Sequence, residues 1–133
     1  MKYRSPLVLG VIILFVGVFV SGFLDWYYFL PHIDKVYHFV GGFALGWFFY
    51  IYFSFKESQL SNFNKLLILV SATCFVAVLW EYAERLSNIY SPEHAKWLYH
   101  WFKGGDLNDT LLDILAGITG SFVFGIFSLS NKD

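Results

Sequence analysis

The sequence predicts an all-α membrane protein, a bundle of four transmembrane helices with a short interfacial helix in the outer loop between helices three and four. Of its 133 residues, 57% are hydrophobic and 14% are charged, whereas about 25% of a typical soluble domain is charged. The mean hydropathy is +0.55. Four stretches approach the roughly 20 apolar residues that cross a bilayer core of about 30 Å. They are residues 6–24, 36–55, 65–85 and 109–128. Because no Pro-, Gly- or Ser-rich linker interrupts the chain, we expect residues 1–133 to form one domain.

The first helix, residues 6–24, follows the basic residues Lys2 and Arg4. Its apolar run is long and lacks an A-x-A cleavage pattern, so we expect a retained helix and not a signal peptide. Basic residues at the loop ends set the orientation of a membrane protein. One side would carry Lys2, Arg4, Lys56, Lys65 and Lys132, and the other Lys35, Arg85, Lys96 and Lys103. This bias predicts a multi-pass protein of the cytoplasmic membrane with both termini in the cytoplasm.

The second helix begins "DKVYHFVGGFALG", with Asp34 and His38 four residues apart on one helical face. The same face continues through Gly42 and Gly46, which form a GxxxG pattern. Small residues of this kind mark the places where membrane helices approach closely. Asp34 and His38 are therefore expected to point into the bundle.

The third helix ends "VLWEYAERL", which contains Glu81 and Glu84. If the helix ends near residue 85, Glu81 lies about 6 Å below the outer boundary, at 1.5 Å per residue. Ala77 and Cys74 continue the same face as a small-residue stripe. Carboxylates inside a membrane are costly and indicate a functional role.

The loop of residues 87–108 contains helix signals: Ser91 as N-cap, Pro92 in the first turn and Gly104 as a stop. Residues 92–103 are thus predicted to form a helix that lies in the membrane interface. This helix would either cover a site beneath it or serve as an aromatic anchor.

The fourth helix begins "GDLNDTLLDILAGITG", with Asp106, Asp109 and Asp113 at offsets of three and four. Below Asp113 the face continues through Gly117 and Gly120. Asp109 is also suited to cap the helix, and Asp106 to lie in the solvated loop. Since all three acidic faces continue as small-residue faces, we expect the acids to converge inside the bundle, just beneath the outer surface.

Convergence would bring several negative charges together, and two like charges 4 Å apart repel by about 4 kcal/mol at an effective dielectric near 20. A divalent metal ion of undetermined identity would relieve this repulsion, because carboxylate oxygens and imidazole are suitable ligands. Alternatively, Lys35 and Arg85 neutralise part of the charge and neighbouring carboxyls share protons. The predicted ligand-binding residues are Asp34, His38, Glu81, Glu84, Asp109 and Asp113. The predicted metal ligands among them are His38, Glu81, Glu84, Asp109 and Asp113.

"DKVYHFVGG", "WEYAE" and "GDLNDTLLDILAGITG", in this order over residues 34–120, resemble the small membrane proteins of the YjdF-like group. More distantly the chain is similar to VanZ-like proteins, which share an Asp-Lys-x-x-His opening and a late Asp followed by a small-residue helix. The VanZ-like resemblance implies a link to glycopeptide (teicoplanin) resistance, although Ala116 stands where that group tends to have Asn. The family pattern also implies that a set of residues acts together, without supplying an activity. The set is Asp34, His38, Glu81, Glu84, Asp106, Asp109 and Asp113.

Several function classes are disfavoured by the composition and the motifs. The net charge of -1 and the scattered basic residues argue against a nucleic-acid partner. The lone Cys74 excludes a disulfide within the chain and a cysteine metal site. No GxSxG, HExxH, P-loop or dinucleotide motif is present, so no catalytic residue is assigned.

Three functions therefore stay open at this stage. The first is an acidic site that binds a divalent cation, a proton or a cationic or lipid-linked small molecule in the bilayer. The second is a metal-dependent enzyme that acts on a lipid-linked or cell-envelope substrate. The third is a structural subunit of a membrane complex.

Overall fold

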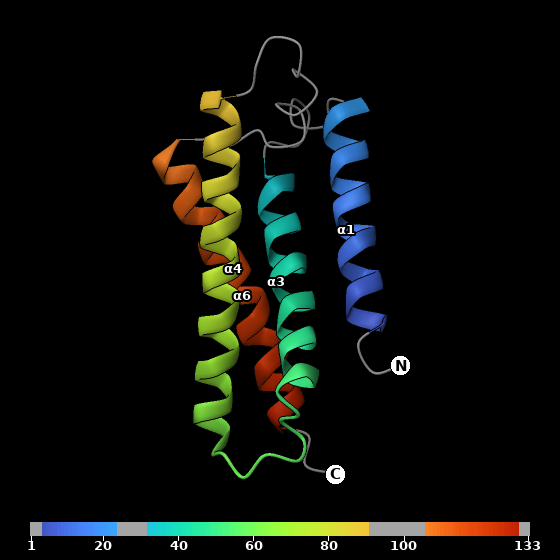
Figure 1. Ribbon diagram of the computed structural model, residues 1–133, viewed down its shortest axis with the longest axis vertical. Coiled ribbons are helices and arrows are strands. Elements are labelled where there is room, and N and C mark those ends of the chain that lie inside the picture. Colours follow the sequence, from blue (N-terminus) through green and yellow to red (C-terminus); the bar gives the residue numbers. More distant parts are fainter. Residues whose placement is uncertain (1–3, 24–31, 91–105, 131–133) are drawn as a thin grey trace.

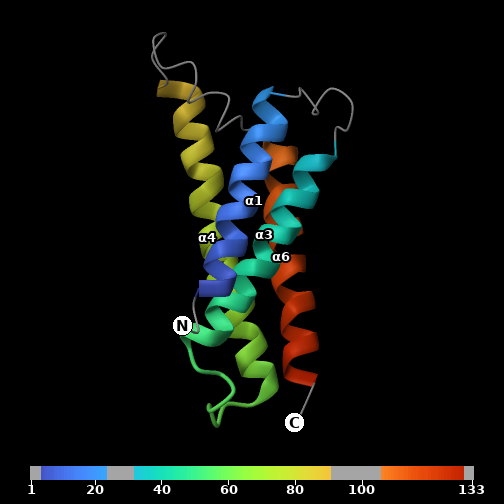
Figure 2. The same ribbon diagram turned by 90° about the vertical axis from the view of Figure 1, so that its right-hand side faces the viewer.

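The computed structural model describes residues 4–23, 32–90 and 106–130, which form four α-helices (Figure 1). These are α1 (Arg4–Phe23), α3 (Ile33–Tyr52), α4 (Asn62–Tyr90) and α6 (Leu107–Ser130). Helices that follow one another in the chain run in opposite directions, so α1 begins and α6 ends toward the end of the bundle that holds the turn between α3 and α4 (Figures 1 and 2). The all-α class predicted from the sequence is confirmed.

Two of the described helices, α4 and α6, are long and apolar enough to cross a membrane, with mean hydropathies of 2.0 and 1.8 over their most apolar windows. Only 22% and 33% of those windows are buried. In a soluble protein, a helix that is apolar on all sides is buried in the core. The exposed apolar surface of α4 and α6 therefore favours contact with lipid.

The helix boundaries differ from the expected spans mainly at the end of α3. The second span was expected to reach residue 55, but α3 ends at Tyr52. Ser54 has a positive φ of 51°, and the Phe55 amide donates to the Tyr50 carbonyl. This turn places the Phe55 ring, which is only 3% exposed, against the ring of Tyr50. Burial of Phe55 thus ends the helix three residues earlier than its apolar composition suggests.

Glycines hold α3 and α6 in close contact along what we call the α3–α6 seam, made by Gly42, Gly46, Gly117, Gly120 and Ser121. A Cβ added to Gly42 would lie 2.7 Å from the Gly117 Cα, and one added to Gly120 would lie 2.8 Å from the Phe43 amide nitrogen. Real Cβ atoms do not approach so closely, so only glycine permits this backbone contact. The seam confirms the expectation that these small-residue faces meet.

A buried polar contact joins α4 to α6 behind the seam. The Thr73 hydroxyl donates to Ser121 Oγ at 2.9 Å, and Ser121 Oγ donates to the Leu69 carbonyl at 3.4 Å. Thr73, Ser121 and Leu69 are all fully buried. Hydrogen bonds of this kind stabilise helix pairs in membranes, where the unsatisfied hydroxyl would otherwise face an apolar environment.

Helix α1 packs differently from the other three. Among the described helices it contacts α3 alone, while α3, α4 and α6 all contact one another. Figure 2 shows α1 lying over the gap between α3 and α4. The interfacial helix predicted at 92–103 lies outside the described residues, as do Lys2 and Lys132 from the orientation argument.

Candidate cation-binding site

Three helices bring their acidic faces together one turn above the point where their backbones are closest. His38, Asp113 and Glu81 each lie four residues from a small buried residue: Gly42 on α3, Gly117 on α6 and Ala77 on α4. A Cβ on Gly117 would lie 3.6 Å from the His38 carbonyl and 3.8 Å from the Ala77 Cβ. Because residues four apart share a helical face, this crossing directs the side chains of His38, Glu81 and Asp113 toward one another.

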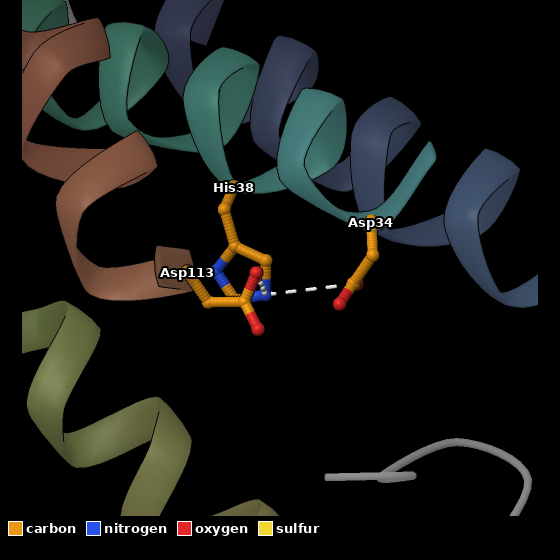
Figure 3. A group of neighbouring side chains, drawn as sticks. All are labelled: Asp34, His38 and Asp113. Atoms are coloured by element: carbon orange, nitrogen blue, oxygen red, sulfur yellow. Dashed lines mark ion pairs between the residues drawn. The ribbon is translucent and has the colours of Figure 1, made fainter. Parts of the chain in front are cut away.

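The His38 imidazole lies among the carboxylates of the three helices. Its Nε2 is 3.7 Å from Asp34 Oδ1, 3.7 Å from Glu81 Oε1 and 3.9 Å from Asp113 Oδ1. Figure 3 shows the carboxylates of Asp34 and Asp113 converging on one nitrogen of the ring. These separations exceed a hydrogen bond, so the space between the atoms suits a small ion or a water molecule.

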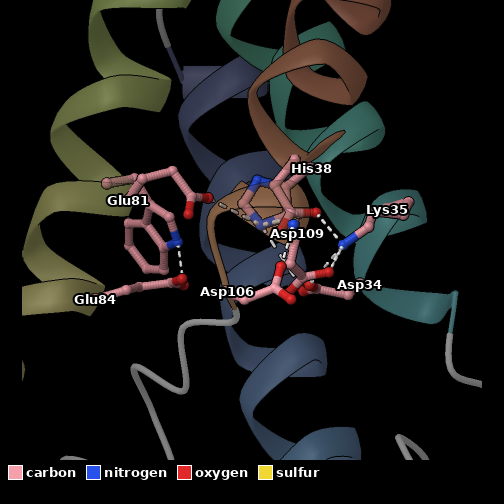
Figure 4. A network of polar contacts seen from close by, with 9 residues as sticks. Asp34, Lys35, His38, Glu81, Glu84, Asp106 and Asp109 are labelled. Atoms are coloured by element: carbon pink, nitrogen blue, oxygen red, sulfur yellow. Dashed lines mark hydrogen bonds and ion pairs between the residues drawn. The ribbon is translucent and has the colours of Figure 1, made fainter. Parts of the chain in front are cut away.

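Lys35 supplies the positive charge of the cluster. Its Nζ is 2.7 Å from Asp113 Oδ1 and 3.5 Å from Asp34 Oδ2, and it also donates to Asp109 Oδ1. Figure 4 shows the ammonium group beside the carboxylates of Asp34 and Asp109. We call Asp34, Lys35, His38, Glu81, Asp109 and Asp113 the acidic cluster. A single lysine within it faces four carboxylates, so the Coulomb repulsion expected from the sequence is only partly compensated.

One carboxylate oxygen in the cluster is deeply buried and lacks a hydrogen bond. Glu81 and Asp113 are 6% and 2% exposed. Asp113 Oδ1 is ion-paired with Lys35 Nζ at 2.7 Å, whereas Glu81 Oε1 has no hydrogen-bond partner within the described part of the chain. A buried carboxylate oxygen without a partner carries a large desolvation cost. Such an oxygen points to a ligand that completes the site.

The residues of the cluster have a composition and spacing that fit a divalent cation. Asp34, His38 and Asp113 each offer one ligand atom, and these three atoms lie within 4.8 Å of one another. Metal bonds to nitrogen and oxygen are about 2.0 to 2.6 Å long, so ligand atoms on opposite sides of an ion are roughly 4 to 5 Å apart. Glu81 Oε1, at the same distance from His38 as Asp34, would be a fourth ligand.

Other predicted ligands are engaged elsewhere. Glu84 is buried and accepts a hydrogen bond from Trp80 Nε1 at 2.5 Å, one turn back on α4. Asp109 is half-buried and holds Lys35. The backbone amide of Asp109 donates to Asp106 Oδ1 at 3.0 Å, so the N-cap of α6 is Asp106 and not Asp109.

The contacts of Lys35 were the part of the site that the sequence predicted least well. Lys35 was expected only as one of two neutralising cations, yet it contacts aspartates from both α3 and α6. Arg85, the other expected cation, is exposed and forms no ion pair with a described residue. A lysine directly after Asp34 and three residues before His38 was the available signal, since its long side chain reaches the neighbouring helix.

A cavity of about 440 Å³ lies beside the cluster. It is bordered by α1, α3 and α4, with Asp34, His38 and Glu84 among its lining residues. The volume is within the range of about 300 to 1,000 Å³ that is usual for small-molecule sites. The acidic cluster is therefore open on one side to a space large enough for an organic ligand.

In a comparison with known protein families, the family model described as "Predicted membrane protein (DUF2238)" matches residues 3–132. No curated protein and no solved structure matches the chain.

Proposed function

The chain belongs to the DUF2238 family of predicted membrane proteins, and from this premise we propose that it binds a divalent cation at the acidic cluster inside a four-span bundle. Helices α4 and α6 satisfy the length and hydropathy of spans, and α1 and α3 run alongside them with 20 residues each. Twenty helical residues extend about 30 Å, which matches the bilayer core.

The same proposal places the protein in the cytoplasmic membrane with both termini inside. An even number of spans and the basic residues Arg4, Lys56 and Lys65 toward one end support this orientation. The acidic cluster would then lie near the outer surface. A tag at residue 133 that can be reached only from outside intact cells would overturn the orientation.

One observation carries the cation proposal: the buried Glu81 Oε1 has no hydrogen-bond partner among the described residues and faces His38 Nε2 at 3.7 Å. A cation between the two would satisfy both atoms, with Asp34 and Asp113 completing the set. The ligand types suit Zn, Mn or Fe, and Mg or Ca through the carboxylates. The YjdF-like resemblance is consistent with the family, and the VanZ-like link remains a proposal.

The contacts of Lys35 favour a second candidate. Its ammonium group already lies among Asp34, Asp109 and Asp113. It therefore neutralises part of the negative charge that a metal ion would otherwise balance. In this alternative the remaining carboxyls share protons and no metal is held. The protein would then bind a proton or a cationic ligand.

Two other functions have support from other features of the molecule. The cavity beside the cluster supports a metal-dependent enzyme that acts on a lipid-linked or cell-envelope substrate. The exposed apolar residues of α4 and α6 support a structural subunit of a membrane complex.

Thermal unfolding with and without EDTA separates the metal from the shared-proton network. If a divalent cation is held, EDTA lowers the melting temperature of the wild type, and Glu81→Gln weakens metal retention at least about tenfold because a charged ligand becomes a weaker neutral donor. Elemental analysis of the wild type and Asp113→Asn provides the second readout. A wild type that ignores EDTA, together with a Glu81→Gln variant that melts higher, would refute the metal and support the shared protons.

A further inference from the structure

The residues that line the cavity beside the acidic cluster follow α3 over most of its length, from Asp34 to Phe48. These two residues are 14 positions apart, so the lining extends about 21 Å along the helix axis. Because the bilayer core is about 30 Å thick, the cavity crosses more than half of it. Its dimensions suit an extended chain better than a compact ligand.

The two ends of the cavity differ in polarity. Asp34, His38 and Glu84 line one end, and residues such as Val11, Leu45 and Phe48 line the rest. None of the lining residues in the described part of the chain is a lysine or an arginine. Lys35 already pairs with Asp34, but the acidic cluster and Glu84 together carry five carboxylates against this one lysine. A cationic head would therefore meet complementary charge at this end of the cavity, whereas an anionic head such as a phosphate would be repelled.

Glycines in the cavity wall leave room where the seam glycines leave none. A Cβ on Gly10 or on Gly41 would have no atom within 4 Å, although both residues line the cavity. Side chains added there would therefore enter the cavity without displacing the backbone. This open space separates α1 from α4, which share no contact in the described structure.

We propose that this cavity binds a single-chain amphiphile with a cationic amine head, the head at Asp34 and Glu84 and the chain along α1 and α3. Charge complementarity selects the amine, and the length and apolar lining select the chain. The inference goes beyond the cation site and does not require a bound metal.

The test uses the full chain in dodecyl maltoside with tritiated dodecylamine as the probe. Unlabelled dodecylamine should compete at least about tenfold more strongly than dodecanol or dodecyl phosphate, since a charge-assisted contact is lost or made repulsive. Equal competition by the alcohol or the phosphate would overturn the charge selection and identify a general lipid groove.

Variants locate the binding. Gly10→Phe and Gly41→Leu should each lower probe binding at least about tenfold by filling the cavity, while Ile12→Phe, on the exposed face of α1, should leave it unchanged. Glu84→Gln and Asp34→Asn should each reduce the preference for the amine over the alcohol. Unchanged probe binding in both glycine variants would place the ligand elsewhere and refute the proposal.

Measurements of metal binding on the same variants distinguish the amphiphile cavity from the cation site. Gly41→Leu should retain metal as the wild type does, because Gly41 offers no ligand. A wild type that binds the amine selectively but binds no metal would refute only the proposed cation site. Metal binding intact without selective amine binding would refute only the amphiphile.

Discussion

The α3–α6 seam and the acidic cluster lie one helical turn apart, yet different forces hold them. The seam is built from backbone contacts so close that Gly42 and Gly120 cannot carry a Cβ. In the cluster, the carboxylate oxygens around His38 Nε2 are 3.7 to 3.9 Å away, and the buried Glu81 Oε1 lacks a hydrogen bond among the described residues. Shape determines stability in the seam, whereas charge determines it in the cluster. The close seam brings the acids together, and they have no comparable packing of their own.

The largest effect should follow from adding a side chain to the seam. Gly42→Leu places its Cβ against the Gly117 backbone and should lower the free energy of unfolding by about 3 kcal/mol or more, the upper range for an overpacked core. Gly10→Leu, which meets no atom within 4 Å, should change it by less than about 0.5 kcal/mol. Equilibrium unfolding in mixed dodecyl maltoside and SDS micelles measures both.

Equal stability of these two leucine variants would show that the seam is not a tight helix interface. Packing would then not determine the stability of the seam. Gly46→Leu gives an intermediate case, because a Cβ there would lie 3.0 Å from Ser121 Oγ, a side-chain atom that can move.

The seam was predictable because small residues that recur on one face of a membrane helix mark helix contacts. This rule was satisfied on α3 by Gly42 and Gly46, which are four apart, and on α6 by Gly117 and Gly120, which are three apart. Gly10 and Gly41 lie off these faces and border a cavity, where an added Cβ would meet no atom within 4 Å. A sequence pattern identifies which face of a helix carries small residues, but it does not give the distance from that face to the neighbouring helix. The cavity therefore became visible only when α1 and α4 were placed.

In the cluster, helical periodicity predicted which acids share a face, but not how their charges pair. His38, Glu81 and Asp113 converge as expected. The reach of Lys35 across to α6, the bond of Glu84 to Trp80 and the cap supplied by Asp106 depend on side-chain conformation. Long side chains have many rotamers, so a spacing rule cannot choose among their partners.

An intermediate effect should follow from removing the positive charge of the cluster. Lys35→Met leaves Asp34, Asp109 and Asp113 without their ammonium partner. We expect the metal-free variant to lose about 2 kcal/mol of stability, less than the roughly 3 to 5 kcal/mol of a fully buried pair, since Lys35 keeps some contact with solvent. Added divalent cation should restore the loss, because the metal replaces the lysine charge at the carboxylates.

Arg85→Met is the matched control, since Arg85 is exposed and outside the ion pairs described here. Its stability should stay within about 0.5 kcal/mol of the wild type. Melting curves of both variants with and without metal make the comparison. A Lys35→Met variant as stable as the wild type without metal would show that charge does not determine the stability of the cluster. Failure of metal to rescue it would favour the shared-proton alternative.

The smallest effect should follow from removing a buried hydroxyl contact between α4 and α6, next to the seam. Thr73→Val keeps the shape of the side chain and loses the donor to Ser121 Oγ, while Ser121 keeps its bond to the Leu69 carbonyl. Interhelical hydrogen bonds in membrane proteins contribute about 0.6 kcal/mol on average, so a loss of that order is expected. Thr119→Val is the control, because the exposed Thr119 hydroxyl bonds only the Leu115 carbonyl of its own helix. If shape dominates this half of the bundle, Thr73→Val must cost several times less than Gly42→Leu in the same micelles. A larger cost for Thr73→Val would mean that polar bonds hold the seam, as charges hold the cluster, and the distinction between the two regions would disappear.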